Sequence, residues 1–169
     1  MAARVFKLEE LTWTEVDTLD RSRTAVFLLS SSIEQHGPHL PLGTELVEAS
    51  AVMRAVAWRV VRAGWTVLLA PPRPYTTAVL SRTFPGSTSV RARHLEGLFT
   101  DVVASFAVNG FADIVVFSQH LDRRPCSPGS ERARMRRPPA RARLRAMSAS
   151  SSTISAPMRS TGFSAPLAR

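Results

Sequence analysis

Carboxylates and imidazoles gather in one short stretch of the sequence, between residues 31 and 45. Glu34 and His36 stand two residues apart, so in an extended segment their side chains project to the same side. The intervening glycines and prolines restrict the path of the chain and let it turn back, which could return Glu45 to the same point. A mixture of carboxylate and imidazole ligands suits Zn²⁺ or Mn²⁺. The stretch therefore predicts a metal site, with ordinary solvated loop residues as the alternative.

A second cluster of the same residue types follows at residues 118–122. His120 and Asp122 repeat the spacing of two residues, with the order of the ligand types reversed. Either cluster alone is more often solvated than ligating, because Asp, Glu and His are common in surface loops. The prediction therefore depends on whether the fold brings the two clusters together.

The elements around these clusters predict an α/β fold. Continuous apolar runs at 24–30, 65–70 and 113–117 indicate buried strands, and apolar stripes at helical spacing indicate helices at 11–20, 46–63 and 90–109. Thr12 or Thr14 is the expected N-cap of the first helix and Ser89 that of the last. Right-handed crossovers make such strands parallel, and ligands bind outside the carboxyl edge of the sheet. We therefore expect the candidate ligands to meet at that edge: Glu34, His36, Glu45, His120 and Asp122.

Composition places the whole positive charge of +9 in the last part of the chain. Residues 1–122 carry 11 Lys and Arg against 12 Asp and Glu, whereas residues 123–169 carry 11 Arg against the single acid Glu131. Because the apolar residues of 123–169 follow no helical or strand period, we predict a disordered tail rich in Arg, Ser, Pro and Ala.

Three explanations of this tail remain open. It could be an Arg-rich arm that binds nucleic acid, which is the alternative function for the protein. Phe163 is its only aromatic residue, which weighs against base stacking and makes nucleic acid a disfavoured partner. It could instead be an appendage without a partner, or the product of a reading-frame shift near Asp122.

The remaining composition indicates a single cytoplasmic domain. A chain of 169 residues fits about one domain, and the lone Cys126 excludes an internal disulfide framework. The sequence shows neither a signal peptide nor an apolar run of about 18 residues, so we expect neither export nor a membrane partner.

The first cluster also carries a family resemblance. The run from Ser32 to Thr44 (SIEQHGPHLPLGT) is similar, nearly residue for residue, to the signature of the creatininase family of amidohydrolases. Residues 84–87 (FPGS) resemble the family's Phe-Pro-Gly-Thr, and residues 118–122 lie where the family has Asn-Gly-His followed by a short acidic or Gly-rich stretch. The resemblance covers residues 8–122, about the first half of a family member, so it implies a truncated fold with the boundary at 122.

The resemblance implies a three-layer α/β/α sandwich with a mostly parallel sheet and a centre of two divalent metal ions. Zn²⁺ is the first expectation, with Mn²⁺ or Fe²⁺ as alternatives, and a metal-activated water would hydrolyse a C–N bond of a small or cyclic amide. Family members also tend to form homo-oligomers.

The resemblance further implies a role for each matching position. Glu34 and His120 would hold one ion, His36 and Asp122 the other, and Glu45 would bridge them where the family usually has Asp. Supporting or loop-shaping roles fall to two further residues, Gln35 and His39.

Overall fold

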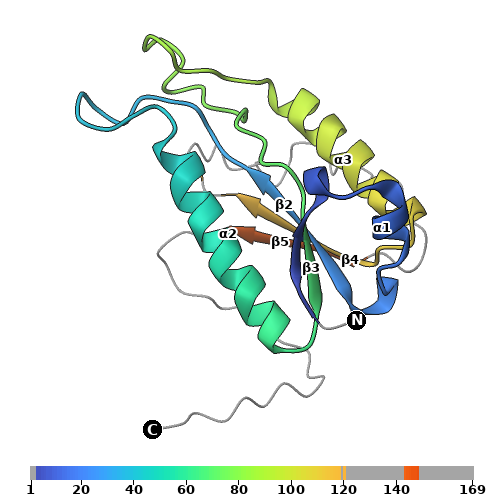
Figure 1. Ribbon diagram of the computed structural model, residues 1–169. Helices are drawn as coiled ribbons and strands as arrows, with labels where there is room; N and C mark the ends of the chain where they lie inside the picture. The colour runs from blue at the N-terminus through green and yellow to red at the C-terminus, as the bar shows by residue number, and fades with distance from the viewer. Residues whose placement is uncertain (1–2, 119, 121–142, 149–169) are drawn as a thin grey trace, which may run out of the picture.

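The fold is built on a parallel sheet of five strands (Figure 1). The computed structural model describes residues 3–118, 120 and 143–148. The strands are β1 (Val5–Lys7), β2 (Thr24–Ser30), β3 (Thr66–Leu69), β4 (Asp113–Ser118) and β5 (Arg143–Ser148). Their order across the sheet is β1-β3-β2-β4-β5, and every neighbouring pair is parallel. The parallel sheet predicted from the three apolar runs is confirmed.

Helices cover both faces of this sheet. The α-helices are α1 (Trp13–Asp17), α2 (Thr44–Arg62) and α3 (Ala92–Val108), and two short 3₁₀ helices are η1 (Leu8–Glu10) and η2 (Arg21–Arg23). The helix α2 packs on one face, whereas α1 and α3 lie on the other (Figure 1). The architecture is therefore the three-layer α/β/α sandwich that was predicted.

The central strand β2 separates two apolar cores. All seven of its residues are buried, which is why Ala25–Leu29 form a continuous apolar run instead of alternating with polar residues. Phe27 and Leu29 face α2, where they pack with Met53, while Val26 and Leu28 face the side of α3. Strand β2 is therefore held from both sides, and the loop that follows it starts from a rigid support.

The helix ends test the predicted caps. Thr12 caps α1 in a capping box, in which its hydroxyl accepts from the Glu15 N–H and the Glu15 carboxylate accepts from the Thr12 N–H. The prediction for Ser89 is wrong, because α3 begins at Ala92 and has Arg91 at its N-cap, with no side-chain hydrogen bond there. The Ser89 hydroxyl instead accepts a hydrogen bond from the backbone N–H of Ala78 and so stabilises the loop that precedes α3.

Two strands lie outside the predicted set. Strand β1 has only three residues, too few to show a period, and it forms by pairing with β3. Strand β5 lies within the predicted disordered tail and pairs with β4 from Asp113↔Arg143 to Ser118↔Ser148. For Arg143–Ser148 the structure thus differs from the expected disorder. The rest of the predicted tail, 123–142 and 149–169, lies outside the described residues.

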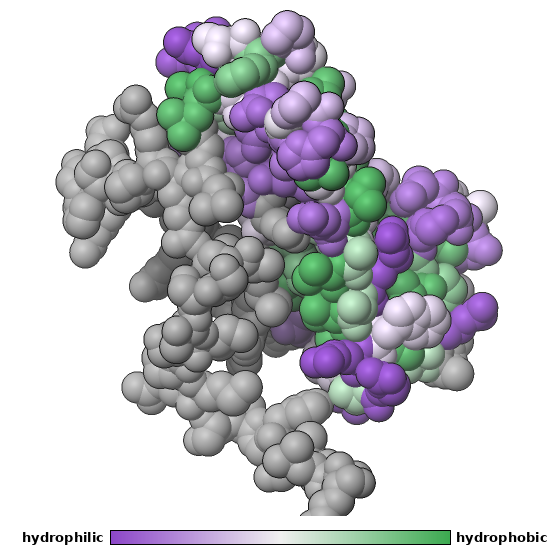
Figure 2. Space-filling view, turned by 90° about the vertical axis from the view of Figure 1, so that its left-hand side faces the viewer, coloured by the Kyte–Doolittle hydropathy of each residue, from purple (hydrophilic) through white to green (hydrophobic). Residues whose placement is uncertain are grey.

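The outer face of α2 carries several exposed apolar side chains. Val47, Val52 and Trp58 are 67%, 41% and 59% exposed. The space-filling view shows apolar residues lying among polar ones on this side of the molecule (Figure 2). Within the described ranges, no helix combines the length and the apolar character needed to cross a bilayer.

Candidate metal centre

The loop after β2 is closed by its own backbone and braced by a second loop. The Glu34 N–H donates to the carbonyl of Leu42 at 3.0 Å, which brings the two ends of the loop together. From the loop that follows β3, the Thr88 N–H donates to the Ile33 carbonyl at 2.9 Å, and the Ser87 hydroxyl accepts from the Gln35 N–H. The two loops extend together from the carboxyl edge of the sheet (Figure 1). The position of Glu34 is therefore set by contacts from two separate segments.

Three elements deliver three ligand-type side chains to one point. Glu34 comes from the loop after β2, Glu45 from the first turn of α2, and His120 from just beyond β4. One ligand atom from each lies within 4.8 Å of the others. His120 Nδ1 is 3.0 Å from Glu45 Oε2 and 3.2 Å from Glu34 Oε1. Residues 34 and 120 come into contact because the parallel strands β2 and β4 end at the same edge of the sheet, as their topology predicts.

His36 approaches the same cluster from the other side of Glu45. Its Nδ1 lies 2.9 Å from the Glu34 carbonyl, and its Nε2 lies 4.0 Å from Glu45 Oε1. Because a carbonyl only accepts, this contact suits the tautomer with its proton on Nδ1, in which the lone pair of Nε2 is directed toward Glu45. The two oxygens of Glu45 thus face two different histidines.

The cluster is well shielded from water. The side chains of Glu34, Glu45 and His120 are 11%, 13% and 8% exposed, and that of His36 is 20% exposed. Burial alone would raise the pKa of Glu45, but hydrogen bonds from His120 and Ser32 and the nearby imidazoles lower it below its usual value. The hydrogen bond to Glu45 in turn raises the pKa of His120 against the opposing effect of burial. The surroundings therefore favour the negative form of Glu45, which is the form that binds a cation.

The donor atoms suit a divalent transition-metal ion. Metal–ligand distances of about 2.1 Å place the donors of a tetrahedral site about 3.4 Å apart. The two contacts of His120 with the carboxylates, at 3.0 and 3.2 Å, are already close to this spacing. The His120 Nε2 atom is also buried. Two carboxylates and imidazole nitrogens converging in this way are the ligand set of zinc and related ions.

The structure thus brings together four of the five residues predicted as ligands, and Asp122 lies outside the described residues. Of the two residues predicted to support them, Gln35 accepts a hydrogen bond from the Gly37 N–H through its side chain and so shapes the loop. His39 is exposed at the tip of the loop, with its ring close to Gly37.

Ser32 lies outside the set of residues predicted for the site. Its hydroxyl contacts both Glu34 and Glu45. Nothing in the run Ser30-Ser31-Ser32 distinguishes it from its neighbours by residue type, and only its place at the start of the family signature singles it out.

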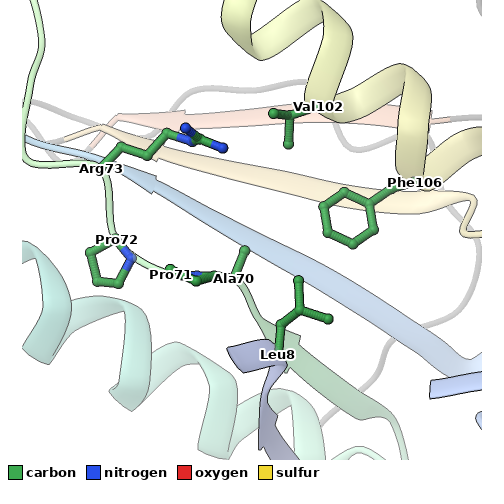
Figure 3. Close-up of a pocket in the computed structure, with 7 residues that line it drawn as sticks. All are labelled: Leu8, Ala70, Pro71, Pro72, Arg73, Val102 and Phe106. Atoms are coloured by element: carbon green, nitrogen blue, oxygen red, sulfur yellow. The ribbon is translucent and has the colours of Figure 1, made fainter. Parts of the chain in front are cut away.

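A separate pocket opens on the side of the sheet that carries α3 (Figure 3). Its volume is about 280 Å³, and its lining is apolar apart from one residue, Arg73. The lining comes from η1, from the segment after β3 and from α3, and includes Leu8, Pro72 and Phe106. It shares no residue with the carboxylate–histidine cluster, so the cluster is a distinct site.

Comparisons with known proteins identify relatives of this chain. The creatininase family model, described as creatinine amidohydrolase, matches residues 9–161, which extends beyond the predicted boundary at 122. The mycofactocin precursor peptide peptidase of Mycobacterium ulcerans (strain Agy99) is 38% identical over 120 residues, covering 68% of this chain and 46% of that protein. The creatinine amidohydrolase of Pseudomonas putida is 27% identical over 128 residues, which cover 72% of this chain and 47% of that protein. The chain therefore spans less than half the length of these curated relatives.

Solved structures show the same likeness. A creatininase mutant complexed with creatine superposes with a TM-score of 0.58 at 26% identity, over 66% of this chain and 43% of that one. A creatininase mutant described as Zn-Zn type gives a TM-score of 0.54 at 26% identity, over the same shares of the two chains.

Proposed function

Because this chain belongs to the creatininase family, we propose that its carboxylate–histidine cluster holds two divalent metal ions and serves the hydrolysis of a C–N bond in an amide. The observation that carries the proposal is the position of Glu45, whose Oε2 lies 3.0 Å from His120 and whose Oε1 lies 4.0 Å from His36. A carboxylate that offers one oxygen to each of two histidines is suited to bridge two cations.

The contacts support a proposed role for each ligand. Glu34 and His120 belong to the position on one side of Glu45, and His36 belongs to the position on the other. Asp122 is the proposed partner of His36. The chemistry that the ions would supply there is Lewis acidity, which activates water and polarises a substrate carbonyl. Zn²⁺ is the first choice and Mn²⁺ or Fe²⁺ are alternatives, since one solved relative is described as Zn-Zn type and another as creatininase Mn.

The substrate class is an amide. Of the two curated relatives, one is named an amidohydrolase of creatinine and the other a peptidase of a precursor peptide, and both names denote cleavage of an amide C–N bond. We propose the general class for this chain and no particular member of it. No observation among the described residues favours the alternative of nucleic-acid binding.

Metal analysis tests the proposal without requiring activity. The purified chain, loaded with Zn²⁺ and freed of excess by gel filtration, is expected to retain up to two ions by mass spectrometry of the metal. His120→Ala and His36→Ala should each weaken binding by more than about 100-fold, because losing a ligand costs more than losing a residue that supports one. His94→Ala, which removes an exposed histidine of α3, is the matched control and should bind as the unchanged chain does. Equal metal content in all four proteins would refute the proposal.

A further inference from the structure

The hydroxyl of Ser32 lies between the two carboxylates of the cluster. Ser32 lies two residues beyond the end of β2 and is completely buried. Its Oγ is 3.2 Å from Glu34 Oε1 and makes a closer contact with Glu45 Oε2. One buried serine thus contacts two acidic side chains that come from different elements.

Ser32 and His120 contact the same two oxygen atoms. His120 Nδ1 lies 3.2 Å from Glu34 Oε1 and 3.0 Å from Glu45 Oε2, which are also the atoms that Ser32 reaches. Two negative groups this close repel one another, and the repulsion is strong where water is largely excluded. The pair is therefore held together by two donors, one imidazole and one hydroxyl.

A cation at this point would change the role of only one of these donors. A ligating His120 nitrogen presents its lone pair and no longer donates a proton to the carboxylates. Ser32 cannot be replaced in this way, because its hydroxyl is neutral and keeps its proton in both states. Its hydrogen bond limits the orientation of the carboxylates with or without an ion.

From this geometry we propose that Ser32 is a positioning residue, which holds the Glu34 and Glu45 carboxylates convergent for a divalent cation. The proposal rests on the metal-binding function proposed above. It adds a residue that contacts the ligands and is not one of them.

The neighbouring residue offers a matched control. Ser31 is as completely buried as Ser32, yet its Oγ makes no hydrogen bond within the part of the chain that is described. Replacing either serine by alanine removes the same atom from an equally buried position. Only Ser32→Ala removes a contact with the cluster.

The test is a calorimetric titration of the metal-free full chain with Zn²⁺, together with the visible absorption spectrum of the Co²⁺-loaded protein. Ser32→Ala should weaken Zn²⁺ binding about 10- to 100-fold, as loss of a partner of a metal ligand does. It should also alter the Co²⁺ spectrum at saturation, because the spectrum follows the geometry of the ligands. Ser31→Ala should match the unchanged chain in both measurements. A purely structural role for Ser32 would lower the melting temperature and leave the Co²⁺ spectrum as it is.

The outcomes separate the two proposals. If the unchanged chain binds Zn²⁺ and Ser32→Ala binds it equally well with the same Co²⁺ spectrum, Ser32 has no positioning role and the metal site stands. If the unchanged chain binds neither ion, both proposals fall. Should Ser32→Ala fail to fold, Ser32→Thr and Ser32→Val form a second pair of similar shape that differs in the hydroxyl. Thr is then expected to bind at least 10-fold more tightly than Val, and equal binding by the two would refute the proposal.

Discussion

Replacing glycine by alanine at three positions should give three different results, because the three glycines lie in different surroundings. Gly86 has a φ of +81°, and an added Cβ would lie 2.5 Å from Cδ1 of Leu42. Gly64 has a φ of +84°, but the nearest atom to an added Cβ is a guanidinium nitrogen of Arg23 at 3.9 Å. Gly97 lies within α3 and would meet nothing within 4 Å. The set separates backbone strain from steric contact.

The magnitudes follow from these differences. Gly64→Ala should lower the free energy of unfolding by about 1–2 kcal/mol, the cost of a left-handed conformation for a residue with a Cβ. Gly86→Ala also displaces the end of the half-buried Leu42 side chain, and forcing that side chain off its preferred rotamer costs about 0.5–1.5 kcal/mol more. Gly97→Ala should instead raise the free energy of unfolding by about 0.5–1 kcal/mol, since alanine is the better helix former. In a chain of this size each kcal/mol corresponds to roughly 2–4 °C in melting temperature.

Gly86→Ala should also weaken metal binding. The carbonyl of Leu42 accepts the hydrogen bond from the Glu34 N–H, so a shift of Leu42 moves a proposed ligand. Urea unfolding followed by circular dichroism gives the free energies, and a Zn²⁺ titration gives the affinity. If Gly86→Ala costs no more than Gly64→Ala and leaves Zn²⁺ binding unchanged, the contact between the loop at 84–87 and Leu42 does not position the site.

Three further predictions concern the fold that carries the site. Thr12→Ala removes the capping box of α1 and should cost about 1 kcal/mol in urea unfolding, whereas Thr100→Ala, in the interior of α3, should stay within about 0.5 kcal/mol. Hydrogen bonds from the Thr12 backbone and side chain lower the pKa of Glu15 below its ordinary value of 4.5. The Glu15 carboxylate therefore stabilises the fold fully at pH values above 4.5, and this stabilisation is lost as the pH falls through the lowered pKa. The stability difference between the unchanged chain and Glu15→Gln should therefore shrink between about pH 6 and pH 3, and a difference independent of pH would contradict this assignment. Phe27→Ala leaves a cavity at a buried position, where the ring centre of Phe117 is 4.9 Å away, and should lower the free energy of unfolding by about 3–5 kcal/mol. The control is Phe84→Ala, at a half-exposed position. Equal melting temperatures of the two variants would count against the described core.

Much of the fold follows from local sequence signals. The run from Thr24 to Ser30 predicts β2 with both its ends, because a strand buried on both faces shows a continuous apolar run in place of alternation. Helix α2 follows from its apolar stripe, and Ala49 and Met53 of that stripe are indeed buried. Both signals lie within one element, so they can be found without knowing what packs against it.

The candidate site was predictable for a different reason. Residues 34 and 120 are far apart in the chain, but parallel strands end at one edge of the sheet, and this rule is enough to expect them together. The ligand types and their spacing supplied the chemistry, and the resemblance supplied the expectation of two ions. How Glu45 shares its oxygens between His36 and His120 depends on the first turn of α2 and could not be known from the sequence.

The remaining features depend on partners that are distant in the sequence. Strand β1 has three residues and exists because β3 pairs with it, and Arg143–Ser148 form a strand against β4 although no local period predicts one. Ser89 has the residue type of a helix cap but binds Ala78 instead. Ser31 and Ser32 are identical in type and burial, and only tertiary structure decides which hydroxyl meets the two carboxylates. Local sequence patterns were enough to identify the buried segments and the side chains that can do chemistry, because both are properties of single elements. Pairing and contact between elements were decided by the folded chain, because they depend on geometry that no one segment contains.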